Sequence, residues 1–140
     1  MPQNAKPWNV LIAEDDFTCC QELIKQLREM AYLTITKDGE EALQSYEKSI
    51  KKKKPFNFIL LDVTMPNKDG FEVLSVIRRH EEALRNPAHK PALVIMITAF
   101  KDSLMERYNM GWDEYITKPI DGKKLIEKMS KLFEARQNIS

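Results

Sequence analysis

The sequence predicts an α/β protein whose doubly wound, parallel sheet is covered by helices on both faces. Five short apolar runs lie along its 140 residues, and the longer ones are nearly continuous, which is typical of strands buried on both faces. Segments with helical spacing of apolar residues separate these runs. A chain in which strand and helix alternate in this way folds with right-handed crossovers into a parallel sheet.

Each expected element corresponds to one of these patterns, taken here in chain order. Strands are expected at residues 10–13 (VLIA), 33–36 (LTIT, the weakest), 56–61 (FNFILL), 92–98 (ALVIMIT) and 114–117 (EYIT). Helices are indicated by apolar side chains three or four residues apart: Leu23, Ile24, Leu27 and Met30; Ala42, Leu43 and Tyr46; Phe71, Leu74 and Ile77; Leu104, Met105 and Tyr108; Leu125, Ile126, Met129, Leu132 and Phe133.

The length and composition predict one domain. An apolar content of 43% supports a single core, so we expect a short amino-terminal arm at residues 1–8 and one domain at 9–137. Lys and Arg total 22 against 21 Asp and Glu, which gives no electrostatic reason to expect nucleic acid or a membrane as partner. The adjacent Cys19 and Cys20 suit a reduced protein. Without an apolar leader or a membrane-length apolar run, we expect a cytoplasmic location.

Acidic side chains follow two of the expected strands. The first strand runs into Glu14, Asp15 and Asp16, and the third ends in Asp62. Ligands of doubly wound sheets bind outside the carboxyl ends of the strands, so we expect these acids to meet at one edge. A group of carboxylates suits Mg²⁺, which keeps several waters and accepts phosphate oxygens. Mn²⁺ could substitute.

Two further strand ends carry groups that suit phosphoryl chemistry. The fourth strand ends in Thr98, and the fifth runs into Lys118, followed by Pro119. A hydroxyl and an ammonium beside a carboxylate and Mg²⁺ supply hydrogen bonds and positive charge to a transferring phosphoryl group. These groups indicate Asp62 as a carboxylate nucleophile that forms an acyl phosphate.

The segments VLIAEDDF, FILLDVTMPNKDG, VIMITAF and GWDEYITKPI resemble the signature segments of response-regulator receiver domains, in the same order and over nearly the whole chain. The resemblance implies a flavodoxin-like sheet of strand order 2-1-3-4-5. It implies Mg²⁺ bound by Asp15, Asp16, Asp62 and the backbone carbonyl of Thr64. It also implies phosphorylation of Asp62 by a phosphohistidine of a kinase or phosphotransfer protein, with Thr98 and Lys118 on the phosphoryl oxygens and a cis bond before Pro119.

The resemblance further implies a signalling switch. Thr98 moves toward the phosphoryl group, Tyr115 turns inward, and the surface over the fourth helix, fifth strand and fifth helix changes for a downstream protein. Such a domain is not a conventional turnover enzyme, although it promotes its own phosphorylation and dephosphorylation. It is expected to be a monomer or a phosphorylation-dependent dimer. The long connections and the closing GWDEYITKPI look more like receivers attached to hybrid histidine kinases.

Structural explanations exist for each residue taken singly. Asp15 and Asp16 could cap the first helix, and Asp62 could be an ordinary turn residue. Thr98 could simply end a strand, Lys118 could be an exposed lysine, and Tyr115 could lie at the sheet edge with its hydroxyl in water. The combination of all of them favours the functional interpretation.

Three other functions fit the sequence less well. A phosphohydrolase of the haloacid dehalogenase type needs an acid two residues after its nucleophile, where this chain has Thr64. A flavodoxin would bind phosphate after the first strand, where three acids repel it. An interaction module independent of phosphorylation would normally have lost a site residue. Within the receiver resemblance, Thr64 and Phe100 are expected to govern water's approach to the acyl phosphate, and because Phe100 is bulky and apolar, self-dephosphorylation is expected to be slow.

Overall fold

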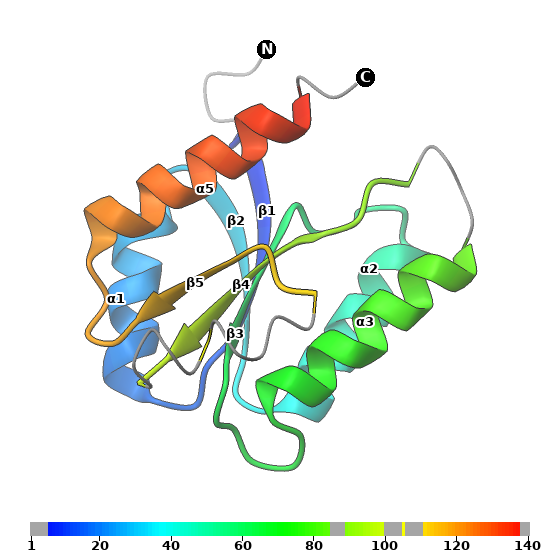
Figure 1. Cartoon of the computed structure of the whole chain (residues 1–140), viewed down its shortest axis with the longest axis horizontal. Coiled ribbons are helices and arrows are strands. Elements are labelled where there is room, and N and C mark those ends of the chain that lie inside the picture. The colour runs from blue at the N-terminus through cyan, green and yellow to red at the C-terminus, as the bar shows by residue number, and fades with distance from the viewer. Residues whose placement is uncertain (1–5, 85–88, 100–104, 106–110, 138–140) are drawn as a thin grey trace.

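The computed structural model describes residues 6–84, 89–99, 105 and 111–137, and their sheet has five parallel strands in the order β2-β1-β3-β4-β5. Figure 1 shows this sheet with β5 at one edge. The predicted fold class and strand order are confirmed. The strands are β1 (Trp8–Ala13), β2 (Ala31–Thr36), β3 (Phe58–Asp62), β4 (Leu93–Thr98) and β5 (Glu114–Thr117).

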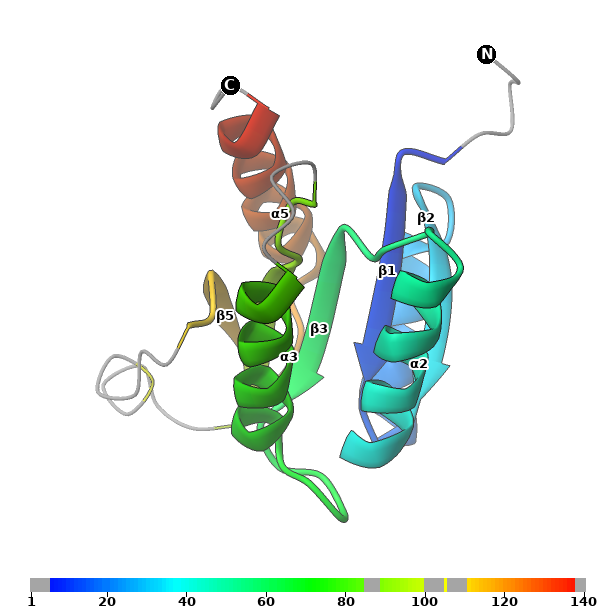
Figure 2. The ribbon, with the colours of Figure 1, turned by 90° about the vertical axis from the view of Figure 1, so that its right-hand side faces the viewer.

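Four helices of the described residues cover both faces of the sheet. Figure 2 shows α2 and α3 on one face, with α5 on the other. Met105, from the predicted fourth helix, is buried in the core, while Leu104 and Tyr108 lie outside the described residues. The described helices are α1 (Phe17–Leu27), α2 (Gly39–Lys51), α3 (Gly70–Leu84) and α5 (Gly122–Gln137). None of them is long and apolar enough to pass through a lipid bilayer.

The sheet divides the core into two clusters because neighbouring residues of a strand point to opposite faces. Ala13, Leu61 and Met96 belong to the cluster beneath α2 and α3. Ile12 and Leu60, by contrast, pack beneath α1 and α5. All residues of β3 and β4 are buried, in agreement with their nearly continuous apolar runs.

Several element boundaries differ from the prediction: β2 begins two residues earlier and β4 one residue later. β1 begins at Trp8, whose buried ring packs edge-on against Phe58 at a centroid distance of 5.0 Å, so this residue belongs to the core and not to an arm. α1 ends at Leu27, and Met30 therefore lies beyond the helix. β3 begins two residues later than expected, although Phe56 is buried before the strand, and it ends in Asp62 as predicted.

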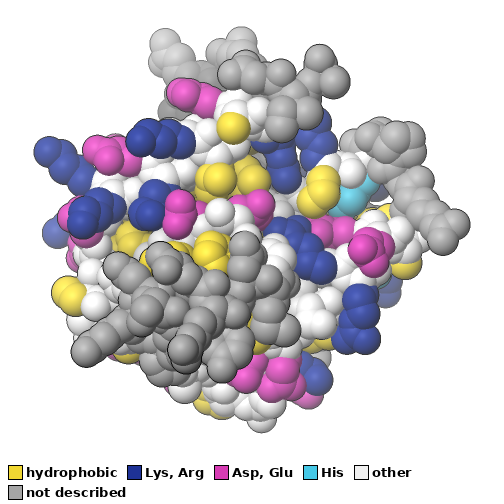
Figure 3. All heavy atoms as spheres, viewed as in Figure 1, with side chains coloured by type: hydrophobic (Ala, Val, Ile, Leu, Met, Phe, Trp, Pro, Cys, Tyr) yellow, Lys and Arg dark blue, Asp and Glu magenta, His cyan; other side chains and the backbone are white. Residues whose placement is uncertain are grey.

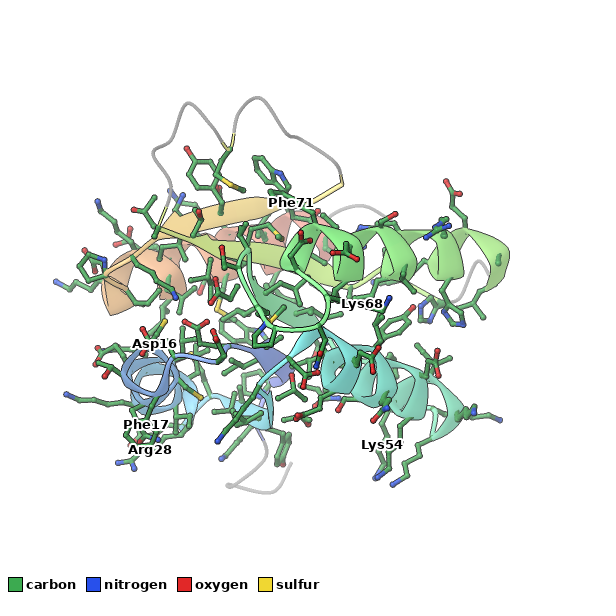
Figure 4. All side chains as sticks on the ribbon, turned by 90° about the horizontal axis from the view of Figure 1, so that it is seen from below. Asp16, Phe17, Arg28, Lys54, Lys68 and Phe71 are labelled. Atoms are coloured by element: carbon green, nitrogen blue, oxygen red, sulfur yellow. The ribbon has the colours of Figure 1, made fainter. Side chains whose placement is uncertain are left out.

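The register brings the carboxyl ends of four strands to one edge. Ala13 pairs with Leu61, Asp62 with Ile97, and Thr98 with Thr117. The residues that follow these positions therefore share the edge that Figure 4 views.

Candidate functional site

Three carboxylates meet at this edge. One oxygen each from Glu14, Asp15 and Asp62 lies within 4.8 Å of the others. Glu14 and Asp62 are buried, whereas Asp15 is exposed. The backbone fixes two of them: the Glu14 N–H donates to the carbonyl of Thr36 at 3.0 Å, and the Thr64 N–H donates to Asp62 Oδ1 at 3.1 Å. Two buried acids this close require a compensating positive charge.

Lys118 supplies that charge from the end of β5. Its Nζ lies 2.7 Å from Glu14 Oε1 and 3.2 Å from Asp62 Oδ2. The Lys118 N–H donates to the carbonyl of Thr98 at 2.8 Å, and the bond to Pro119 is cis, as predicted. The ammonium therefore bridges two of the three acids and leaves Asp15 facing solvent.

The site shifts the pKa values of Asp62 and Lys118. Burial raises the pKa of Asp62 to about 7, and the neighbouring Glu14 carboxylate adds to this, while the Thr64 N–H and Lys118 oppose it. Burial acts to lower the pKa of Lys118, but the hydrogen bond to Glu14 and the charges of both acids outweigh it and raise the pKa above its usual value. The lysine thus stays charged at neutral pH, while Asp62 is poised between its two forms.

The buried Glu14 carboxylate leaves a demand for positive charge. When Asp62 is ionised, Glu14 Oε2 has no hydrogen-bond donor among the described residues. An orphaned anionic oxygen beside two further carboxylates is expected to favour a bound cation. The donor set consists of hard oxygens alone, which fits Mg²⁺ or Mn²⁺.

Asp16, a predicted metal ligand, lies outside this group of carboxylates. Its Oδ1 accepts hydrogen bonds from the N–H groups of Thr18 at 3.0 Å and Cys19 at 3.5 Å, so it is the N-cap of α1. Glu14, and not Asp16, lies beside Asp15 and Asp62. The signal that could have indicated this is the start of the first helix, because an aspartate directly before a helix is a favoured N-cap.

The remaining predicted residues are distributed around the acids. Thr98 is buried at the end of β4. Thr64 is exposed, and its N–H holds Asp62. Tyr115 is half-buried, with its ring edge-on to Trp112 at a centroid distance of 5.4 Å. Phe100 lies outside the described residues.

We predict that the metal-free protein loses stability as the pH rises from about 4 to about 7, by up to about 1.4 kcal/mol per pH unit. In this range the folded state keeps the Asp62 proton, because the pKa of Asp62 is raised to about 7, whereas the unfolded state has released it. Denaturant unfolding in a chelator checks this, with Asp62→Asn expected to show a flatter dependence. Equal pH slopes for the two proteins would contradict the assignment.

Comparison with known proteins gives a consistent result. The model of the response regulator receiver domain matches residues 10–130. The chain is 37% identical to hybrid signal transduction histidine kinase I of Dictyostelium discoideum over 86% of its own length, but spans 7% of that protein. The chain is also 31% identical to chemotaxis protein CheY-3 of Vibrio cholerae. That match covers 92% of this chain and 94% of the Vibrio protein.

Two solved structures resemble the fold closely. A chain of the CheX–CheY–BeF3–Mg²⁺ complex from Borrelia burgdorferi has a TM-score of 0.76 and 30% identity, over 91% of this chain and 90% of that one. A chain of the complex between the Saccharomyces cerevisiae phosphotransfer protein Ypd1 and the receiver domain of Ssk1 has a TM-score of 0.74 and 25% identity. The match covers 89% of this chain and 87% of that one.

Proposed function

This chain belongs to the response-regulator receiver family of two-component and phosphorelay signalling, and from this premise we propose that it accepts a phosphoryl group on Asp62 from a phosphohistidine. An Asp62 oxygen attacks phosphorus, the new O–P bond forms as the P–N bond breaks, and the histidine nitrogen keeps the electron pair and takes up a proton. The product is an acyl phosphate, so the domain is not a conventional turnover enzyme.

Each neighbour of Asp62 has a defined part in this transfer. Lys118, already 3.2 Å from Asp62 Oδ2, neutralises negative charge that develops on the phosphoryl oxygens. Thr98 donates its hydroxyl to one of these oxygens. Glu14, Asp15, Asp62 and the Thr64 carbonyl would bind Mg²⁺. When bound, the ion supplies further positive charge to the phosphoryl group.

The Lys118 ammonium between two buried acids carries this proposal. Incubation with acetyl phosphate and Mg²⁺ should add the mass of one phosphoryl group to the intact protein, and excess chelator should abolish the gain. A protein that gains no phosphate, or that steadily hydrolyses phosphate esters, would contradict the proposal.

The ligand set of Glu14, Asp15 and Asp62 gives a second prediction. Glu14→Gln should weaken Mg²⁺ binding about tenfold or more, because it removes an anionic ligand. Asp16→Ala should leave Mg²⁺ affinity within about twofold of the parent, but lower the free energy of unfolding by about 1 kcal/mol through loss of the helix cap. Calorimetric Mg²⁺ titration and denaturant unfolding measure the two effects. A larger loss of affinity in Asp16→Ala would restore the original assignment.

A groove beside the site suits a docking phosphodonor. It runs between the start of α1 and the loop after β5, and its lining includes Asp16, Thr18, Lys118 and Pro119. Phe17 follows Asp16 at the start of α1 (Figure 4), and 73% of it is exposed. We propose that the phosphodonor packs against Phe17 as its histidine approaches Asp62.

Phe17→Ala should therefore slow transfer from a phosphorylated histidine phosphotransfer domain about tenfold, while phosphorylation by acetyl phosphate stays unchanged, because that small donor does not dock. Tyr32→Ala is the matched control, since this aromatic residue is 53% exposed on the edge strand β2. Equal transfer rates for Phe17→Ala and Tyr32→Ala would exclude Phe17 from the docking surface.

The output follows from the movement of Thr98 and Tyr115, which changes the surface of β5 and α5 for a downstream protein. The fourth-helix part of that surface lies outside the described residues, as does Phe100, whose bulk is proposed to slow dephosphorylation. A regulator that acts by docking and a receiver of a hybrid histidine kinase are both compatible with this chemistry.

A further inference from the structure

The three residues before β5 are fastened to two neighbouring elements. Arg78 of α3 donates from Nε to the carbonyl of Gly111 and from Nη2 to Asp113 Oδ2, both at 2.9 Å. Asp113 also exchanges two hydrogen bonds with the backbone of Val94 in β4, at 2.7 and 2.8 Å. Gly111 has a φ of +106°, which favours glycine. The backbone on both sides of Trp112 is therefore fixed.

This anchored segment holds the Trp112 indole against Tyr115. The two rings are 5.4 Å apart and nearly perpendicular, at 86°. Both side chains pack against the core cluster beneath α2 and α3. The Nζ of Lys128, which pairs with Glu114 at 3.1 Å, lies 5.9 Å from the Tyr115 ring centroid. Figure 3 shows acidic and basic side chains interspersed on the face that includes β5 and α5. Tyr115 thus lies between a rigid aromatic contact and the charged surface of α5.

Strand register links Tyr115 to the phosphorylation site. Tyr115 pairs with Met96, and Thr98 lies two residues beyond Met96 on the same face of β4. Asp62 lies two residues after Leu60 and so shares its face of the sheet, which is opposite to the face of Met96 and Thr98. A movement of Thr98 toward Asp62 therefore changes the environment on the face that Tyr115 and Trp112 share.

We propose that Trp112 is a positioning residue for Tyr115, which sets how readily the tyrosine moves when Asp62 is phosphorylated. The inference rests on the proposed function. The edge-to-face contact stabilises the arrangement in which it is made, so any movement of Tyr115 away from Trp112 must break it. An aromatic pair of this kind shifts such an equilibrium about two- to tenfold.

Fluorescence tests the coupling directly. The chain has two tryptophans, so Trp8→Phe leaves Trp112 as the sole one. On addition of acetyl phosphate and Mg²⁺, its emission should change in proportion to the phosphorylated fraction measured by intact mass, and should stay constant in an added Asp62→Asn variant. Complete phosphorylation with unchanged emission would overturn the inference alone. Absence of phosphorylation would overturn the proposed function, and this inference with it.

Fluorotyrosine labelling tests the positioning role, with the Tyr115 signal assigned by Tyr115→Phe. In unphosphorylated Trp112→Ala, this signal should shift toward the position it has in the phosphorylated parent, and the population of that Tyr115 arrangement should change at least twofold. In Trp112→Phe, which keeps an aromatic ring, the signal should stay near that of the unphosphorylated parent. Should Trp112→Ala fail to fold, Trp112→Leu replaces it. A Tyr115 signal unaffected by loss of the aromatic ring, or affected equally by the phenylalanine, would contradict the role.

Discussion

Asp62→Asn is expected to gain no phosphoryl group from acetyl phosphate and Mg²⁺ under conditions that phosphorylate the parent completely. The amide nearly matches the carboxylate in size, but it lacks the anionic oxygen that attacks phosphorus. We expect phosphorylation below about one-hundredth of the parent rate. Intact mass and the initial rate of phosphate incorporation measure the change.

The same variant should remain folded, which separates loss of chemistry from loss of structure. Its substitution removes one of two neighbouring buried carboxylates and with it their mutual repulsion. At pH 8 in a chelator, its denaturation midpoint should therefore equal or exceed that of the parent. Phosphorylation of Asp62→Asn at the parent rate would show that another residue is the acceptor.

Lys118→Met should slow phosphorylation about 100-fold at saturating Mg²⁺. The apolar side chain keeps similar length but removes the ammonium that lies 2.7 Å from Glu14 Oε1 and 3.2 Å from Asp62 Oδ2. Charge on the phosphoryl oxygens then loses the stabilising ammonium and keeps only the metal ion, and loss of one such group typically costs about 10²–10³ in rate. The pKa of Asp62 should also rise further, because Lys118 lowers it in the parent.

Lys128→Met is the matched control. This lysine also makes an ion pair, at 3.1 Å with Glu114, but it belongs to α5, and its partner precedes Tyr115. Its phosphorylation rate should stay within about threefold of the parent. If Lys118→Met and Lys128→Met proved equally active, the bridging ammonium would have no special part in the transfer.

Much of the fold follows from patterns that the sequence displays openly. The runs ILL of β3 and VIMI of β4 contain no alternating polar residues, so both faces of these strands must be buried. A central position in a parallel sheet covered by helices provides this burial. Boundaries were harder to predict. β1 begins two residues earlier than predicted, at Trp8, because Phe58 and Phe133, distant in sequence, provide packing partners for its ring.

The kinds of group at this site could be predicted, but not which of the three consecutive acids lie beside Asp62. Asp62 and Lys118 meet as expected because their strands end at one edge. Three consecutive acids, however, offer two adjacent pairs, and only the start of α1 distinguishes them. Asp16 uses its carboxylate to cap that helix, and Glu14 continues the phase of β1 into the buried side of the cluster. The sequence alone indicates only a packing role for Trp112. Its contact with Tyr115 appears in the structure, where Arg78 binds the backbone of the neighbouring Gly111.

Chemical trapping of the phosphorylated residue tests the central claim most directly. Borohydride reduces an acyl phosphate to an alcohol, so an aspartyl phosphate becomes homoserine, which peptide mass spectrometry locates. After phosphorylation with acetyl phosphate and Mg²⁺, homoserine should be found at position 62. Its appearance at position 15 or 16 instead, or the persistence of an unreduced phosphate on another residue, would contradict the assignment of Asp62 as the phosphoacceptor.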